Sequence, residues 1–254
     1  MAAPATVMVE DANGARWITL DRPPVNVLDL PTLEAIGAAL APLESRRDIK
    51  VVVLRSAIAG TFSAGVEVRD HARERVGAML DTFHGVIRRL HALPQASLAA
   101  VDGTCLGGGC ELAAMCDVVL ATPRSVLGQP EIDVGCFAPV ASVLLPRLAG
   151  RAAAEIVLTG APLSAAEAAR IGLLSRVVDD LDAETRRVVK LLAGKSAAVL
   201  ALARRALREG STGTFSDALA RVEALYRDEL LATADAEEGV RAFLEKRPPR
   251  WKDR

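Results

Sequence analysis

Two glutamates stand in the surroundings that proton transfer requires. Glu111 follows three glycines in the run LGGGCEL (106–112), and Glu131 follows a proline in the run LGQPEI (127–132). Apolar neighbours raise the pKa of a carboxyl group, and a carboxyl with a pKa near neutral pH can serve as a general acid or base. Glu131 alone also fits a simpler role, because an acidic residue after proline commonly stabilises the start of a helix. The two residues together predict acid–base chemistry.

The glycine triplet 107–109 is predicted to form a turn between a strand and a helix. Residues 101–106 lead out of an apolar run, and residues 111–115 are typical of a helix. Free N–H groups at the start of a helix carry partial positive charge, and glycine lets an oxygen atom approach them closely. A tight packing turn is the structural alternative. A dinucleotide-binding fingerprint is rejected, because Leu112 stands where its third glycine is required.

A second turn of small residues lies in the run FSAGVEV (62–68), after the apolar run 51–54. Taken alone, it fits an ordinary loop. Two such turns, each following a buried strand, can place two backbone N–H donors around one oxygen atom, which is the arrangement of an oxyanion hole. A carboxyl group beside such donors is what a reaction through an enolate needs.

The elements that position these residues are predicted to alternate between strands and helices. Apolar runs that predict buried strands lie at 51–54, 98–101 and 118–120, and residues 16–20 also predict a strand. Residues 30–44 predict a helix opened by Pro31. Buried strands that alternate with helices indicate the α/β class with parallel pairing.

The second half is predicted to be mainly helical. Ser164 and Glu167 form a capping box for a helix that ends near residue 170. Apolar residues at three- and four-residue spacing predict helices at 195–208 and 215–231. The residues that form an apolar stripe on the second of these helices are Leu219, Val222, Leu225 and Tyr226.

That stripe packs either on the chain's own body or on another subunit. We predict a division into a core at 1–194, which holds the site, and a helical oligomerisation region at 195–254.

Composition excludes several classes of protein. The 254 residues are 51% hydrophobic, and 31 basic residues nearly balance 32 acidic ones, which gives a formal net charge of −1. A general nucleic-acid binder would be basic, and no apolar run is long enough to span a membrane. Residues 1–9 lack the features of a signal peptide or a transit peptide. We therefore expect a cytoplasmic protein with no nucleic-acid or membrane partner.

The cysteines and histidines predict neither a metal site nor a disulfide. The cysteines that fit no zinc spacing and no redox pair, and are predicted to be reduced and buried, are Cys105, Cys110, Cys116 and Cys136. His71, His84 and His91 are scattered and match no metal-binding motif.

Six segments resemble the enoyl-CoA hydratase/isomerase (crotonase) superfamily, and they follow the family's order. Three carry the two small-residue turns and the second glutamate: FSAGVE (62–67), LGGGCEL (106–112) and GQPEI (128–132). The others are LDRPPVNVL (20–28), PLSAAEA with IGL (162–173), and EEG through FLEKR (237–247). The resemblance covers roughly residues 7–252.

The resemblance implies a spiral of repeated ββα turns, followed by a helical trimerisation region, and a homotrimer or homohexamer. It implies a coenzyme A thioester as substrate and no cofactor beyond the coenzyme A that the substrate carries. By motif position, the N–H groups of Val66 and Gly108 form the oxyanion hole. Glu111 and Glu131 match the two acid–base residues of a hydratase.

The resemblance also implies where the substrate is bound. The positions that match the family's CoA and substrate contacts are Arg22, Val25, Ala64, Glu67, Val68, Arg69, Gly107 and Phe137. The two arginines suit phosphate groups, although solvated surface charge explains them equally well.

The sequence departs from the family pattern after the second glutamate. The usual Pro-Gly is absent, Phe137 and Val140 add bulk close to the acid, and Glu67 replaces the usual Asp. The Phe-Ala-Pro stretch at 137–139, with His71 and Phe83, is similar to members that hydrate alicyclic dienoyl-CoA thioesters. The residues predicted to line an acyl pocket are His71, Met79, Leu80 and Phe83, with ordinary helix packing as the alternative.

The resemblance therefore predicts a lyase that adds water to an enoyl-CoA thioester or removes it from a 3-hydroxyacyl-CoA. The alternatives on the same scaffold are an isomerase, a thioester hydrolase, a decarboxylase and a non-catalytic RNA-binding relative. Retention of both glutamates favours hydration, and the balanced charge disfavours RNA binding.

Overall fold

A six-stranded sheet is the largest sheet of the fold, and the other elements are arranged around it. In a computed structural model, which describes residues 5–254, its strands in spatial order are β1 (Val7–Ala12), β2 (Ala15–Leu20), β4 (Val51–Ser56), β7 (Ala96–Val101), β9 (Val118–Ala121) and β12 (Arg176–Val177). Only the β1–β2 pair is antiparallel among these. The predicted strands and their parallel pairing are confirmed. Residues 1–4 of the N-terminal segment considered above lie outside the described residues.

A second, smaller sheet stands beside the first. Its strands in spatial order are β11 (Leu163–Ser164), β10 (Val126–Gly128), β8 (Thr104–Leu106) and β5 (Thr61–Ser63), and a separate pair joins β3 (Val27–Leu28) to β6 (Gly65–Val66). The chain repeatedly passes from a strand of the first sheet to a strand of the second and then into a helix, as in β7–β8–α3. The predicted spiral of ββα units is confirmed.

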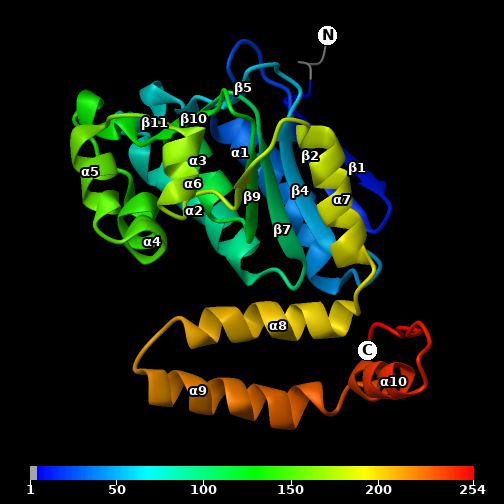
Figure 1. The fold of residues 1–254 in the computed structure, drawn as a ribbon. Helices are drawn as coiled ribbons and strands as arrows, with labels where there is room; N and C mark the ends of the chain where they lie inside the picture. The colour runs from blue at the N-terminus through cyan, green and yellow to red at the C-terminus, as the bar shows by residue number, and fades with distance from the viewer. Residues whose placement is uncertain (1–4) are drawn as a thin grey trace.

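The helices cover both faces of the large sheet and then leave it. The helical segments before residue 160 are α1 (Leu30–Leu40), η1 (Ala41–Ser45), η2 (Val68–His71), α2 (Val76–Ala92), α3 (Gly108–Ala114), η3 (Pro130–Val134), α4 (Pro139–Ala149) and α5 (Ala152–Thr159). The later ones are α6 (Ala165–Arg170), α7 (Leu181–Ala193), α8 (Ala197–Gly210), α9 (Phe215–Ala224), η4 (Leu225–Leu230) and α10 (Ala234–Leu244). Figure 1 shows α7 on one face of the sheet, α1, α2, α3 and α6 on the other, and α8 and α9 as a layer below. In the part of the chain that the structure describes, no helix is long and apolar enough to cross a membrane.

Two helix predictions need correction. The helix predicted at 30–44 is α-helical only to Leu40 and continues as a 3₁₀ turn, because Pro42 has no N–H to donate to the preceding turn. The helix predicted at 215–231 becomes a π-helix after Ala224. Within the predicted stripe, Leu225 is buried whereas Leu219 and Tyr226 are exposed.

Strand β4 separates two hydrophobic cores. Val52 and Leu54 face the larger core, which α1, α2, α3 and the second sheet complete. Val51 and Val53 face a smaller core, closed by α7 through Val188 and its neighbours. Successive side chains of a strand point to opposite faces, so a continuous apolar run is buried on both sides. The large core surrounds the glycine turn and fixes its position.

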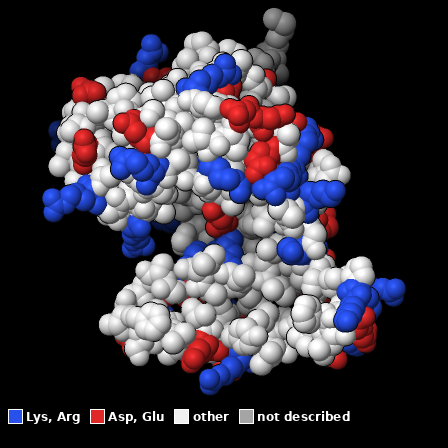
Figure 2. Space-filling model, in the orientation of Figure 1, with Lys and Arg blue, Asp and Glu red and all other residues white. Residues whose placement is uncertain are grey.

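A buried arginine fastens α8 to the body. The Arg204 guanidinium donates to Asp117 at 2.6 Å and to the Leu90 and His91 carbonyl oxygens at the end of α2, each at 2.9 Å. Charge-assisted bonds of this kind are among the stronger ones in proteins. Beyond α8 the chain exposes large apolar side chains, including Phe215 on α9 and Phe243 on α10, and Figure 2 shows few charges over α8 and α9. The division at 194/195 and the oligomerisation role remain predictions.

Charging the exposed phenylalanines is expected to break an oligomer. Phe215 and Phe243 are 84% and 83% exposed in the single chain, and exposed apolar patches often mark protein interfaces. We expect light scattering to give a mass of three or six chains, and Phe215→Asp with Phe243→Asp to lower it. Met8→Asp, on β1, is the matched control and should leave the mass unchanged. A monomeric wild-type chain would contradict the expectation.

Candidate active site

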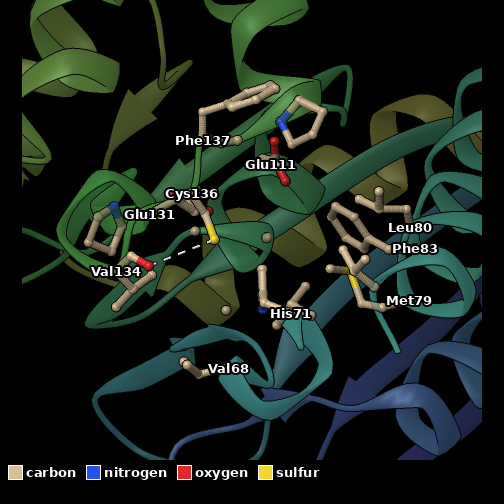
Figure 3. A pocket seen from close by; sticks show the side chains of 18 of the residues that line it. Val68, His71, Met79, Leu80, Phe83, Glu111, Glu131, Val134, Cys136 and Phe137 are labelled. Carbon is tan, nitrogen blue, oxygen red and sulfur yellow. Dashed lines mark hydrogen bonds between the residues drawn. The ribbon is translucent and has the colours of Figure 1, made fainter. Parts of the chain in front are cut away.

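A cavity of about 490 Å³ lies between η2 and α2 on one side and residues 130–139 on the other. The glycine turn before α3 closes its inner end, and both Glu111 and Glu131 line it. In Figure 3, Glu111, Cys136 and Glu131 border the cavity from above, while His71 and Val68 border it from below. The two glutamates predicted to act together are therefore brought together.

Glu111 is a buried carboxyl with one strong hydrogen bond. It lies in the first turn of α3, is only 3% exposed, and its Oε1 accepts the Ala141 N–H at 2.7 Å. Burial is the main reason that the pKa of Glu111 is raised to about 7; the charge of Glu131 contributes to the rise, while the Ala141 and Val140 N–H groups oppose it. At neutral pH both the acid and the carboxylate form are populated, as general acid–base catalysis requires.

Glu131 is half-buried on the opposite side of the cavity. Burial raises the pKa of its carboxyl above the usual range, and the positive charge available on His71 opposes that shift. With the buried amide of Gln129 oriented so that its nitrogen faces Glu131, that nitrogen lies 3.3 and 3.2 Å from the two carboxyl oxygens. The amide therefore holds the carboxyl in one orientation.

The glycine triplet has no space for side chains. Gly107 has φ +53°, and a Cβ on it would lie 2.8 Å from Oε1 of Glu131. A Cβ on Gly108 would lie 2.6 Å from Cγ2 of Val66. Glycine is thus needed at Gly107 for both its conformation and the approach of the carboxyl. The helix begins at Gly108 rather than at Glu111.

The backbones of Val66 and Gly108 lie close together. The Val66 nitrogen is 3.5 Å from the position of a Gly108 Cβ. The Glu67 N–H donates to the Leu28 carbonyl at 3.2 Å across the β3–β6 pair. Since consecutive N–H groups of a strand point to opposite edges, the Val66 N–H points away from β3. Gly108 is the first residue of α3, where an N–H has no intrahelical acceptor.

Most of the predicted binding residues line the cavity, and four do not. The predicted site and acyl-pocket residues in its wall are Ala64, Val66, Val68, His71, Met79, Leu80, Phe83, Gly107, Gly108, Glu111, Glu131 and Phe137. The predicted residues outside the wall are Arg22, Val25, Glu67 and Arg69. The arginine at position 22 pairs with Asp29 at 2.9 Å, whereas the one at 69 is exposed. The glutamate at 67 caps η2 by accepting the N–H of residue 69 at 3.2 Å.

Two sequence predictions about the wall are wrong. Cys136 is half-buried and lines the cavity, because it follows the left-handed Gly135 at the end of η3; the other three thiols are free and buried as predicted. Val140 adds no bulk beside the acid: its side chain packs against the core and its N–H faces Glu111.

Sequence reasoning missed part of the wall on α2. Val76 and His84 line the cavity together with Met79, Leu80 and Phe83. The spacing of positions 76, 79, 80 and 83 is that of a single helix face, so the signal was present. Among residues 5–254, no group of three or more His, Cys, Asp or Glu side chains is arranged to hold a metal ion.

Replacing Glu111 by glutamine is expected to stabilise the protein increasingly as pH rises. The folded pKa of about 7 exceeds the ordinary value of 4.5, so the native state loses stability as pH rises from about 4.5 through 7. Glutamine cannot ionise and can still accept the Ala141 N–H. The shift corresponds to about 3 kcal/mol at about 1.4 kcal/mol per pKa unit. Denaturant unfolding at pH 5 and 8 measures the difference.

Glu155→Gln, at an exposed position on α5, is the matched control and should show no such trend. The difference in unfolding free energy between Glu111→Gln and the wild type should grow from pH 5 to pH 8. An equal difference at both pH values would contradict the assignment of a raised pKa to buried Glu111.

Comparison with known proteins identifies the family. The model of the enoyl-CoA hydratase/isomerase family matches residues 10–254. The chain is 38% identical to a cyclohexa-1,5-dienecarbonyl-CoA hydratase of Thauera aromatica, over 100% of this chain and 98% of that protein. It is 35% identical to a probable enoyl-CoA hydratase of Mycobacterium tuberculosis, with 98% of each covered.

Solved structures agree with the sequence comparison. An enoyl-CoA hydratase of Bacillus anthracis superposes with a TM-score of 0.93 at 29% identity, over 98% of this chain and 100% of that chain. The human enoyl coenzyme A hydratase domain-containing protein 3 gives a TM-score of 0.92 at 29% identity, over 97% and 100%. The chain belongs to the enoyl-CoA hydratase/isomerase family, and its fold is that of the crotonases.

Proposed function

We propose that the protein adds water across the Cα–Cβ bond of an enoyl-CoA thioester, or removes it from a 3-hydroxyacyl-CoA. The observation that carries the proposal is the pair Glu111 and Glu131, which line one cavity from different elements with both pKa values raised by burial. The hydratase names of relatives that match over the whole chain support a reaction of this class.

The thioester carbonyl is polarised by two backbone donors. We assign them to the N–H groups of Val66 and Gly108, whose backbones lie close together beside the cavity. As water adds at Cβ, negative charge moves onto the carbonyl oxygen, and these donors stabilise the resulting enolate. A donor of this kind is typically worth roughly 3 kcal/mol in a transition state.

The two carboxyl groups divide the proton transfers. Glu111, as its carboxylate, takes a proton from water while the water oxygen bonds to Cβ. Glu131, as its acid, then donates a proton to Cα of the enolate. The reverse sequence dehydrates a 3-hydroxyacyl-CoA. Carboxyl pKa values raised toward neutral pH suit both directions.

The coenzyme A portion lies outside the cavity in this proposal. Arg69 is exposed and, among residues 5–254, has no acidic partner within 4.0 Å, so its guanidinium can pair with a phosphate. Arg22 would have to share its guanidinium between a phosphate and Asp29. The Ala64 N–H donates to the Val25 carbonyl at 2.9 Å, which joins Val25 to a residue of the cavity wall. The proposal needs no cofactor beyond the substrate's own coenzyme A, and it includes a homotrimer or homohexamer.

The wall of the cavity suits an apolar acyl group. Met79, Leu80 and Phe83 form an apolar side, and Phe137 stands at the mouth with 67% of its surface exposed. One relative of similar length is named for a cyclic dienoyl-CoA substrate. We therefore place an alicyclic dienoyl or enoyl thioester ahead of a short straight-chain one.

Hydration in labelled water tests the proposal. Wild-type protein incubated with straight-chain, branched and cyclic enoyl-CoA thioesters in H₂¹⁸O should add one labelled water to at least one of them, as mass spectrometry reads. Glu111→Gln and Glu131→Gln should each lower turnover by about 10²–10⁴-fold while folding normally. A migrated double bond or free coenzyme A in place of hydration would indicate an isomerase or a hydrolase, and near-normal turnover in either variant would refute the two-acid assignment.

Gly107→Ala should impair turnover beyond its effect on stability. Its Cβ would displace the Glu131 carboxyl, 2.8 Å away, and misplacing a catalytic group by an ångström costs on the order of 10²-fold. Gly60→Ala is the matched control, since Gly60 has a similar φ of +74° but open space around its Cβ position. Both variants should lose thermal stability, and only the first should lose turnover. Equal turnover in the two would contradict the positioning role.

A further inference from the structure

We propose that His71 accepts a hydrogen bond from a hydroxyl group on the acyl part of the substrate, beyond Cβ. The preferred substrates are then hydroxylated acyl-CoA thioesters. This inference rests on the proposed function, because it takes the cavity to hold the acyl group. It concerns a residue that neither acid–base step nor carbonyl polarisation requires.

The tautomer of His71 is fixed by its own backbone. Its Nδ1 lies 3.2 Å from the carbonyl oxygen of Glu67. A carbonyl oxygen can only accept, so Nδ1 carries the hydrogen and the neutral ring leaves Nε2 as a bare acceptor. No hydrogen-bond partner for Nε2 exists among residues 5–254, and Nε2 is not among the nitrogens sealed from solvent. An acceptor in that state selects a donor, and a hydroxyl is the simplest donor that an acyl chain can carry.

The side chains that line the cavity beside His71 are mainly apolar, so few other groups there can accept a hydrogen bond. The neighbouring lining side chains on η2 and α2 are apolar, namely Val68, Val76, Met79, Leu80 and Phe83. Only His84 adds another imidazole to this side, and its Nε2 is buried without a partner among the described residues, so it is closed to a ligand. His71 is therefore the open hydrogen-bonding group of an otherwise hydrophobic wall.

The position of His71 indicates which part of the acyl group it contacts. Glu111 and Glu131 hold the water and the Cα–Cβ bond, and His71 borders the cavity from the opposite side (Figure 3). The ring lines the same cavity as both carboxyl groups. We therefore assign the hydroxyl that His71 contacts to the carbons after Cβ.

Binding of non-reactive thioesters tests the inference separately from the reaction. The probes are cyclohexanecarbonyl-CoA and its 2-, 3- and 4-hydroxy derivatives, measured by titration calorimetry on the full-length protein. The 3- or 4-hydroxy form should bind about tenfold more tightly than the parent, because a site built around a hydrogen bond discriminates against the analogue that lacks it. His71→Met should bring that ratio close to one while retaining affinity for the parent, and His71→Gln, which keeps an acceptor, should restore part of it. His91→Met, at a histidine outside the cavity wall, is the control and should keep the wild-type ratio.

Each outcome decides the question. Loss of the preference in His71→Met with its partial return in His71→Gln supports the inference. No preference for a 3- or 4-hydroxyl in the wild type, or a preference that survives His71→Met, overturns it. A preference confined to the 2-hydroxy form also overturns it, since that hydroxyl is on Cβ and belongs to the glutamates. Hydroxyl-dependent binding without hydration of any enoyl-CoA would instead refute the proposed function and leave the binding role of His71 in place.

Discussion

The site depends on one constraint, which is the close packing of backbone around the glycine triplet. A Cβ on Gly107 would meet Glu131, one on Gly108 would meet Val66, and one on Gly109 would lie 2.6 Å from Cβ of Ser63. Three segments that are distant in sequence therefore meet where no side chain can separate them. This contact brings the second carboxyl and Val66 beside the start of α3, because the second sheet and the β3–β6 pair hold these segments side by side.

The same packing makes the chemistry costly for stability. Removing a carboxyl group from water disfavours its charged form. For Glu111, the hydrogen bond from the Ala141 N–H offsets part of this cost. Proteins retain such groups where function requires them, and buried titratable residues in a cavity are typical of active sites. The fold offsets the cost elsewhere through two hydrophobic cores on either side of the main sheet and through the buried Arg204 anchor.

Much of this arrangement was predictable from sequence because it depends on local rules. Apolar runs predict buried strands such as β4, and the Ser164–Glu167 capping box is present as predicted. The glycine triplet predicts a turn between a strand and a helix, and Gly107 stands in that turn with a φ of +53°. Other features depend on contacts between distant segments. The bond from Ala141 to Glu111 joins residues thirty positions apart, and the exposure of Cys136 follows from how η3 lies across the cavity. No periodicity in the sequence encodes either of them.

The central claim is that the backbone beside the glycine turn polarises a thioester carbonyl, and vibrational spectroscopy tests it most directly. A saturated acyl-CoA with ¹³C in its thioester carbonyl would be bound to the wild-type protein and to Gly108→Ala, whose Cβ would lie 2.6 Å from Cγ2 of Val66 and so push the two donors apart. We predict that the carbonyl stretching frequency falls when the ligand binds the wild type, and falls less in the variant, because two N–H donors weaken the C=O bond. An unchanged frequency in the wild-type complex, with binding shown independently, would contradict the account.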